Sequence, residues 1–128
     1  MDTLSHISLS VSDLKISSKF YDSVLSCIGL NRVYSGPTAS GWGPTDTEEK
    51  FAIKKRVNKV ATPSAGFHLA FHAKTRDEVH TFYTAALESG GKDNGSPGPR
   101  PKYGSDYYAA FVIDPDGYEL EVKLYSSK

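Results

Sequence analysis

The strongest constraint on how this chain can fold is an internal repeat with a spacing of 62 residues. Five residues of the first half recur without a gap in the second half, as the pairs His6 and His68, Phe20 and Phe82, Tyr21 and Tyr83, Leu25 and Leu87, and Gly29 and Gly91. Repetition in register of this kind indicates duplication of one folding unit. The sequence therefore predicts two copies of a unit in which a strand, a helix and further strands follow one another.

Hydrophobic periodicity locates the first strand and the helix of each unit. Residues 4–11 and 66–73 alternate between apolar and polar side chains, which is typical of strands with one buried face. An apolar stripe with helical spacing follows each strand. Ser12 is the predicted N-cap of the first helix, and Thr75 with Glu78 forms a capping-box pattern for the second.

The remaining segments define the predicted boundaries. The first unit covers residues 1–56, a linker without periodicity covers 57–65, and the second unit covers 66–128. Further strands are predicted around residues 30–34, 40–42, 51–55, 107–113 and 118–125.

Between two of these strands, residues 94–106 are rich in Gly, Pro and Ser and are predicted to form a loop. Loops of this length often bind ligands, so Arg100, Lys102 and Tyr103 are candidate ligand contacts. The alternative is a solvent-exposed connector whose charged side chains bind no ligand.

Composition excludes several classes of partner. The chain has 15 basic and 15 acidic residues, so no net field favours nucleic acid or an anionic membrane. No apolar run is long enough to span a bilayer, and the N-terminus lacks the pattern of a signal peptide. The single cysteine, Cys27, has no partner for an internal disulfide, which fits a reducing compartment. We therefore expect a soluble, cytoplasmic protein.

Two histidines and two glutamates have side-chain types suited to binding a metal ion. His6 and His68 occupy equivalent places on the polar faces of the two first strands. Glu119 and Glu121 share one face of the last strand, after the turn Asp-Pro-Asp-Gly. If the units are related by a pseudo-twofold axis, equivalent positions can converge there. Two imidazoles and one carboxylate would leave open coordination positions, as in catalytic metal sites. The alternative is that each histidine is an ordinary polar side chain.

The segments that carry these residues also resemble a known superfamily. They are Ser-His-Ile-Ser-Leu-Ser-Val-Ser-Asp-Leu around His6, the Phe20-Tyr21 helix, Gly-Phe-His-Leu-Ala around His68, and Asp-Pro-Asp-Gly-Tyr-Glu-Leu-Glu ending at Glu121. Together they resemble the vicinal oxygen chelate superfamily, which includes glyoxalase I, fosfomycin-resistance transferases, extradiol dioxygenases and bleomycin-binding proteins. The chain is most similar to its small glyoxalase-like members. The resemblance implies an α+β fold in which two βαβββ modules form a curved mixed sheet around a central cleft, with helices on the outside.

The resemblance also implies a chemistry. His6, His68 and Glu121 would bind one divalent ion per site (zinc, nickel, manganese, iron or cobalt), and a small oxygenated substrate would chelate that ion. A homodimer is implied as well, with the cleft either within one chain or between two. Lys54 stands where glyoxalase I carries a fourth ligand, a glutamate, so a three-ligand site like that of the transferases or dioxygenases fits better.

Other residues are candidates for supporting roles. Lys54 and His72 are candidates for proton transfer. Trp42, Tyr103 and either Tyr107 or Tyr108 could line an aromatic pocket, since only one of two adjacent strand residues can face it. Of that pair we select Tyr108, and Glu119 is predicted to be a pocket or surface acid. The rival interpretation is a metal-free protein of the same fold that binds and sequesters a small drug or toxin.

Overall fold

The computed structural model describes residues 3–56 and 63–125, and in these ranges it contains two α-helices and eight strands. The first module consists of β1 (Ile7–Val11), α1 (Leu14–Ser26), β2 (Asn31–Ser35), β3 (Ala39–Gly43) and β4 (Phe51–Lys55). The second consists of β5 (Leu69–Ala73), α2 (Arg76–Glu88), β6 (Lys92–Pro99), a short 3-10 helix (Pro101–Tyr103), β7 (Tyr108–Ile113) and β8 (Glu119–Leu124). The predicted α+β class and the two βαβββ modules are confirmed.

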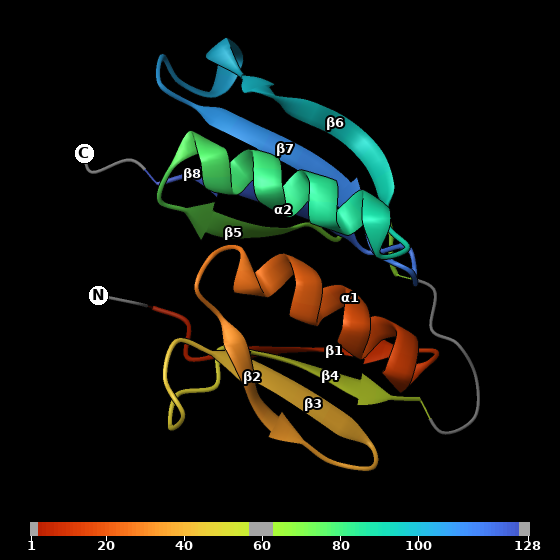
Figure 1. Ribbon diagram of the computed structural model, residues 1–128. Helices are drawn as coiled ribbons and strands as arrows, with labels where there is room; N and C mark the ends of the chain where they lie inside the picture. The colour runs from red at the N-terminus through yellow and green to blue at the C-terminus, as the bar shows by residue number, and fades with distance from the viewer. Residues whose placement is uncertain (1–2, 57–62, 126–128) are drawn as a thin grey trace.

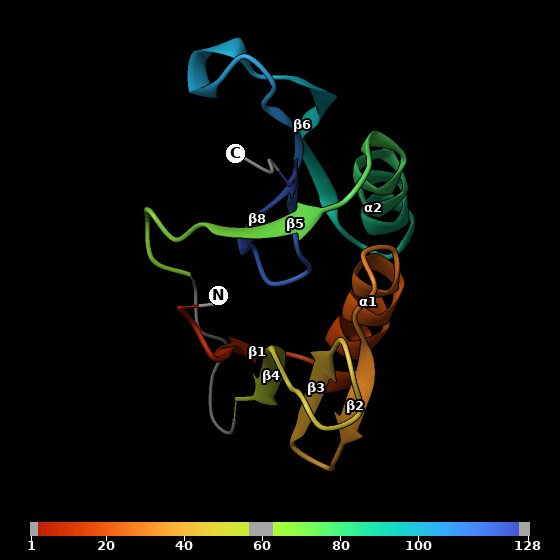
Figure 2. The same cartoon turned by 90° about the vertical axis from the view of Figure 1, so that its left-hand side faces the viewer.

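The two modules have the same topology. Their strand orders are β1-β4-β3-β2 and β5-β8-β7-β6, with the first and last strand of each module parallel and the other pairs antiparallel. The first strand and the helix of one module begin and end 62 residues before their counterparts, which agrees with the repeat. Figure 2 shows both helices on one side of the molecule and both sheets on the other. Most of the predicted linker, residues 57–62, lies outside the described residues.

A shared aromatic core joins the modules. The helices α1 and α2 lie against each other, and each lies over the sheet of its own module (Figure 1). Tyr21 of α1 packs on Phe51 with their ring centroids 4.7 Å apart, and Phe51 in turn packs on Phe71 of the other module at 5.7 Å. Neither helix of the described ranges is long and apolar enough to cross a membrane.

The Asp-Pro-Asp-Gly turn connects the second module to α1. Asp114 is only 3% exposed. Its carboxylate accepts a hydrogen bond of 2.5 Å from the hydroxyl of Tyr21 and bonds of 2.9 Å from the backbone N–H groups of Asp116 and Tyr118. Burial raises the pKa of the Asp114 carboxyl above its ordinary value, although these hydrogen bonds oppose the shift.

This pKa shift predicts an unusual pH dependence of stability. Because the folded protein binds a proton at Asp114 more tightly than the unfolded chain does, this group favours folding at low pH and loses that contribution as the pH rises. We expect the free energy of unfolding of the wild type to increase relative to that of an Asp114→Asn variant as the pH falls toward 3.8, the ordinary pKa of the group. Urea unfolding at several pH values measures this difference. A difference that shrinks as the pH falls would contradict it.

Of the two predicted N-caps, Thr75 of α2 is confirmed and Ser12 of α1 is wrong. The backbone N–H of Glu78 donates to the Thr75 hydroxyl at 3.1 Å. The Glu78 carboxylate accepts from the backbone N–H of Lys74 at 2.8 Å, one residue before the position that a capping box requires. The prediction of Ser12 as the cap of α1 is wrong, since Asp13 caps this helix by accepting from the backbone N–H of Ile16 at 3.0 Å. The Ser12 backbone and hydroxyl donate instead to Asp116 of the other module. Ser12 is thus bound to a residue far away in the sequence, which a local sequence pattern does not reveal, and Asp13 caps the helix in its place.

The predicted loop at 94–106 is wrong for most of its length. Residues up to Pro99 belong to the edge strand β6, and the 3-10 helix follows. The pairing of β6 with β7 shifts register on both sides of Gly95, so the strand is bulged. Glycine and proline are compatible with a bulged edge strand, where one row of backbone groups needs no partner.

Two glycines of β3 allow the segment after this strand to fold back over the sheet. A Cβ atom at Gly43 would lie 1.6 Å from the backbone oxygen of Glu48, and a Cβ atom at Gly41 would lie 1.9 Å from the Glu49 carboxylate. The first obstacle is backbone, whereas the second is the end of a flexible side chain.

Alanine at these two positions should therefore have unequal effects. We expect Gly43→Ala to cost about 1–3 kcal/mol of unfolding free energy, because the backbone must move. Gly41→Ala should cost less, since the Glu49 side chain can rotate away. Urea unfolding of both variants measures the difference, and equal losses would contradict this reading of the segment.

Candidate functional site

The sheet faces that point away from the helices carry the predicted polar residues. On β8, Leu120 and Val122 pack into the core, so Glu119, Glu121 and Lys123 point to the opposite face. Glu121 is paired with Phe111 of β7 and is only 4% exposed. A buried carboxylate needs partners, and this one has two.

A histidine and a tyrosine bind the two oxygens of Glu121. His68, which immediately precedes β5, places its Nε2 atom 2.7 Å from Oε1 of Glu121. The hydroxyl of Tyr107 donates to Oε2 at 2.5 Å. Burial, together with this hydrogen bond, raises the pKa of the Tyr107 phenol, which therefore stays a neutral donor. Two of the three predicted ligands are thus in direct contact.

These three residues line a cavity of about 590 Å³, together with Tyr103 and Phe111. The ring of Phe111 lies 6.0 Å from that of His68, and the rings of Tyr103 and Tyr107 lie 5.3 Å apart. Aromatic side chains with a few convergent polar groups are typical of small-molecule sites. The candidate ligand contacts Arg100 and Lys102 stack on two of these rings.

Of the adjacent tyrosines, Tyr107 faces the cavity and Tyr108 does not. The hydroxyl of Tyr108 lies 2.5 Å from Nε2 of His80 on α2, and its ring lies under the guanidinium of Arg76. Sequence reasoning selected Tyr108 and missed Phe111. The signal that could have found the inward residues is the register of β7 against β8, which sets Phe111 opposite Glu121.

His6 lies elsewhere in the single chain. It lines a separate depression of about 530 Å³, together with His72, Phe51 and Phe71. Its Nδ1 atom lies 2.9 Å from the hydroxyl of Ser5. Within residues 3–56 and 63–125, no group of three or more His, Cys, Asp or Glu side chains could hold a metal ion. One chain by itself therefore brings together His68 and Glu121 but not His6.

The other candidate residues have varied environments. Trp42 is fully buried in the core, where its indole N–H donates to Asp22 at 2.9 Å, so it offers no surface to a ligand. Lys54 is exposed near the end of β4, and Glu119 is exposed at the start of β8.

Glu49 is an acid of the first module that the predicted site did not include. Its carboxylate lies over Gly41 of β3. The neighbours Ser40 and Trp42 point toward α1, so Gly41 and the carboxylate above it lie on the opposite face of the sheet. This is the face to which alternation also directs Ser8 and Ser10 of β1.

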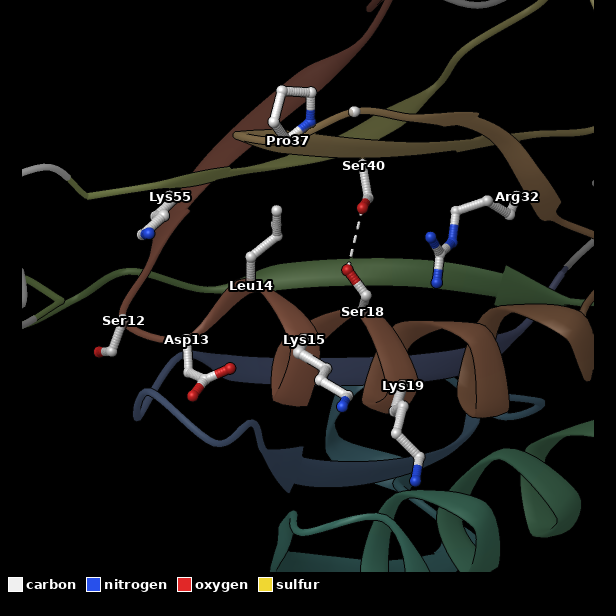
Figure 3. A pocket seen from close by; sticks show the side chains of 11 residues that line it. Ser12, Asp13, Leu14, Lys15, Ser18, Lys19, Arg32, Pro37, Ser40 and Lys55 are labelled. Carbon is white, nitrogen blue, oxygen red and sulfur yellow. Dashed lines mark hydrogen bonds between the residues drawn. The ribbon is translucent and has the colours of Figure 1, made fainter.

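Another cavity, of about 540 Å³, lies between α1 and β3 (Figure 3). Its lining includes the hydroxyls of Ser18 and Ser40, which are 2.9 Å apart, and four cationic side chains. None of the predicted site residues lines it.

The cavity around His68 and Glu121 provides two of the protein ligands that a metal centre needs. An imidazole nitrogen and a carboxylate oxygen that already face each other are both ordinary ligands of zinc and related divalent ions. Tyr107 holds the second carboxylate oxygen and orients it, as outer-shell partners of metal ligands do. A third protein ligand must come from outside this pair.

Residues 3–122 match the family model of the glyoxalase/bleomycin resistance protein/dioxygenase superfamily. The chain belongs to this superfamily. The chain is 33% identical over 124 residues to a lactoylglutathione lyase of Haemophilus influenzae, a match covering 91% of this chain and 87% of that protein. The predicted family resemblance is thereby confirmed, whereas superfamily membership leaves the reaction open.

Solved structures of the glyoxalase superfamily have the same fold. A glyoxalase/bleomycin resistance protein from Albidiferax ferrireducens T118 superposes with a TM-score of 0.85 at 27% identity, covering 97% of this chain and all (100%) of that one. A fosfomycin resistance protein from Mesorhizobium loti superposes with a TM-score of 0.71 at 18% identity, covering 99% and 95% of the two chains. The second likeness concerns the fold alone.

Proposed function

We propose that this protein is a metal-dependent enzyme that acts on a small oxygenated molecule. His68 and Glu121 of one chain and His6 of a second chain would hold one divalent ion. The observation that carries this proposal is the 2.7 Å contact between His68 and Glu121, on a face that is open to a ligand cavity. A catalytic metal site needs ligand-type side chains that converge on a cavity and leave a coordination position open to substrate.

The second chain enters the proposal because His6 lines a different depression from His68. A twofold dimer is isologous, so each chain could give its His6 to the other and receive one in return. Two equal sites would result. Glu49, which lies on the outward face of the first module, would approach the same cavity and could supply a further acid near the ion.

The ion, when bound, would act as a Lewis acid on substrate oxygens. The side chains of the protein perform the remaining tasks. The Tyr107 hydroxyl holds Glu121 in one orientation. The rings of Tyr103 and Phe111 line the cavity and would contact the apolar part of the substrate. Lys54 and His72 are the candidates for moving a proton, and Glu119 is a candidate contact at the rim.

The type of reaction is proposed only as lyase or isomerase, transferase, or dioxygenase. A lyase is favoured by the likeness to the lactoylglutathione lyase of Haemophilus influenzae. A three-ligand transferase or dioxygenase is favoured by Lys54, a cation at the position where the resemblance to glyoxalase I implies a ligand. A metal-free binding protein is the rival function, and the aromatic lining of the cavity would suit it equally.

Titration of metal-free protein with zinc, nickel, manganese, iron(II) and cobalt ions separates the two functions. For an enzyme of the proposed kind we expect at least one of these ions to bind with one ion per chain, measured by calorimetry. The oligomeric state, measured by sedimentation, should be a dimer. Absence of binding by every ion would favour the sequestering protein.

A further inference from the structure

Three cationic side chains lie near the cavity of His68 and Glu121, each over one of the aromatic rings that line it. The guanidinium carbon of Arg100 is 5.3 Å from the ring centroid of Phe111. The Nζ atom of Lys102 is 5.2 Å from the ring of Tyr103, and that of Lys123 is 4.7 Å from the ring of Tyr107.

The structure gives these three cations no acidic partner among the residues that it describes. Within residues 3–56 and 63–125, Arg100, Lys102 and Lys123 make no ion pair with a carboxylate. The cavity lining contains one acid, Glu121, whose two oxygens are already bound by His68 and Tyr107. These three cations outnumber the one acid of the lining, and field lines concentrate in a concave site with apolar walls.

Arg100 is held in place before any ligand arrives. Its Nη2 donates to the backbone oxygen of Ser96 at 2.7 Å and its Nη1 to that of Pro99 at 3.2 Å. A guanidinium has five N–H donors, so these two bonds leave others free for an oxyanion. Because the side chain is already ordered, binding an anion costs less conformational entropy.

We propose that the ligand of this cavity is a small organic oxyanion with a flat apolar body, such as an aryl carboxylate or an aryl phosphonate. The oxyanion lies toward Arg100 and Lys102, and the flat body lies among Tyr103, Tyr107 and Phe111. Cation and ring together bind such a molecule, because each stacked cation is only partly hydrated and the exposed ring surface is apolar. This inference rests on the proposed function in taking the cavity around Glu121 as the substrate site.

The test uses the metal-free, full-length protein and two probes of one shape, benzoate and the neutral benzamide. Backbone NMR shifts give both the affinity and the site. We expect benzoate to bind at least about 10-fold more tightly than benzamide, which corresponds to one charge-assisted hydrogen bond. The shifts should concentrate at Tyr103, Tyr107 and Phe111. Benzoate binding should also weaken with added salt, because the contribution is electrostatic.

Two variants identify the residue responsible. Arg100→Gln should lower the affinity for benzoate by about 10-fold and leave that for benzamide unchanged. Lys92→Gln, at the exposed start of β6, is the matched control and should change neither. Phenylphosphonate in place of benzoate distinguishes the two oxyanion types by their relative affinities.

Several outcomes would overturn the inference. They are equal affinities for benzoate and benzamide, unchanged benzoate affinity in the Arg100→Gln variant, no binding of any probe, and shifts that map to the cavity beside Ser18 and Ser40 instead. Because no metal is present, these outcomes are independent of the metal titration. Metal binding without oxyanion preference would leave the proposed function standing and remove this inference.

Discussion

We expect Glu121→Gln to lower the affinity of the protein for a divalent ion by at least about 100-fold. Removal of an outer-shell partner alone costs up to about that much, and loss of a ligand should cost no less. The amide is neutral, so its carbonyl oxygen is a weaker ligand than a carboxylate oxygen, and its nitrogen does not ligate. Tyr107 and His68 keep a polar neighbour of the same size, so the fold is retained. Calorimetric titration of metal-free wild type and variant measures the loss.

Glu119 provides the matched control for this experiment. It lies two residues earlier on the same face of β8, but it is exposed and no hydrogen bond joins it to His68. Glu119→Gln should therefore leave the metal affinity within about 3-fold of that of the wild type. The reason is that a solvent-exposed charge contributes little to the binding free energy. If the two variants lost affinity equally, a diffuse electrostatic effect would explain the result better than ligation by Glu121.

Replacing Asp114 with alanine should destabilise the protein by about 3–5 kcal/mol, because the hydroxyl of Tyr21 and two backbone N–H groups lose a buried acceptor together. The effect is large for a turn residue since this turn holds the second module to α1. Urea unfolding at neutral pH measures it.

Tyr21→Phe separates the inter-module bond from the turn itself. This variant removes one donor and leaves the two backbone N–H groups bound to Asp114. We expect a loss of about 1–3 kcal/mol, smaller than that of Asp114→Ala. A loss below about 1 kcal/mol for Asp114→Ala would mean that water replaces the carboxylate, and that the turn contributes little to joining the modules.

The fold was predictable because local pattern and internal repetition agree. Alternation at 4–11 and 66–73 and the helical stripes behind them locate β1, β5, α1 and α2 with small errors at the ends. The errors occur where distant residues decide. Ser12 donates to Asp116, more than one hundred positions away, which leaves Asp13 to cap the helix. The strand β6 forms from Gly-Pro-rich sequence because β7 lies beside it.

The candidate site was predictable in residue type rather than in arrangement. Repetition singled out His6 and His68, and the turn singled out Glu121, but the sequence does not state that His6 and His68 line different depressions of one chain. Trp42 was selected as a pocket residue on its aromatic character, whereas strand alternation turns it into the core. The orientation of Tyr107 toward Glu121 depends on strand pairing, which local pattern does not specify.

Mixing two variants that each lack one metal ligand tests whether two chains share each site. His6→Ala and Glu121→Gln chains are unfolded, combined in equal amounts and refolded, and the metal bound by the mixture is compared with that bound by each variant alone. A mixed dimer with shared sites regains one intact site, made from His68 and Glu121 of one chain and His6 of the other. We predict that about a quarter of all sites recover wild-type affinity, as random pairing in a twofold dimer requires. A mixture that binds no more metal than its two components would contradict the shared site.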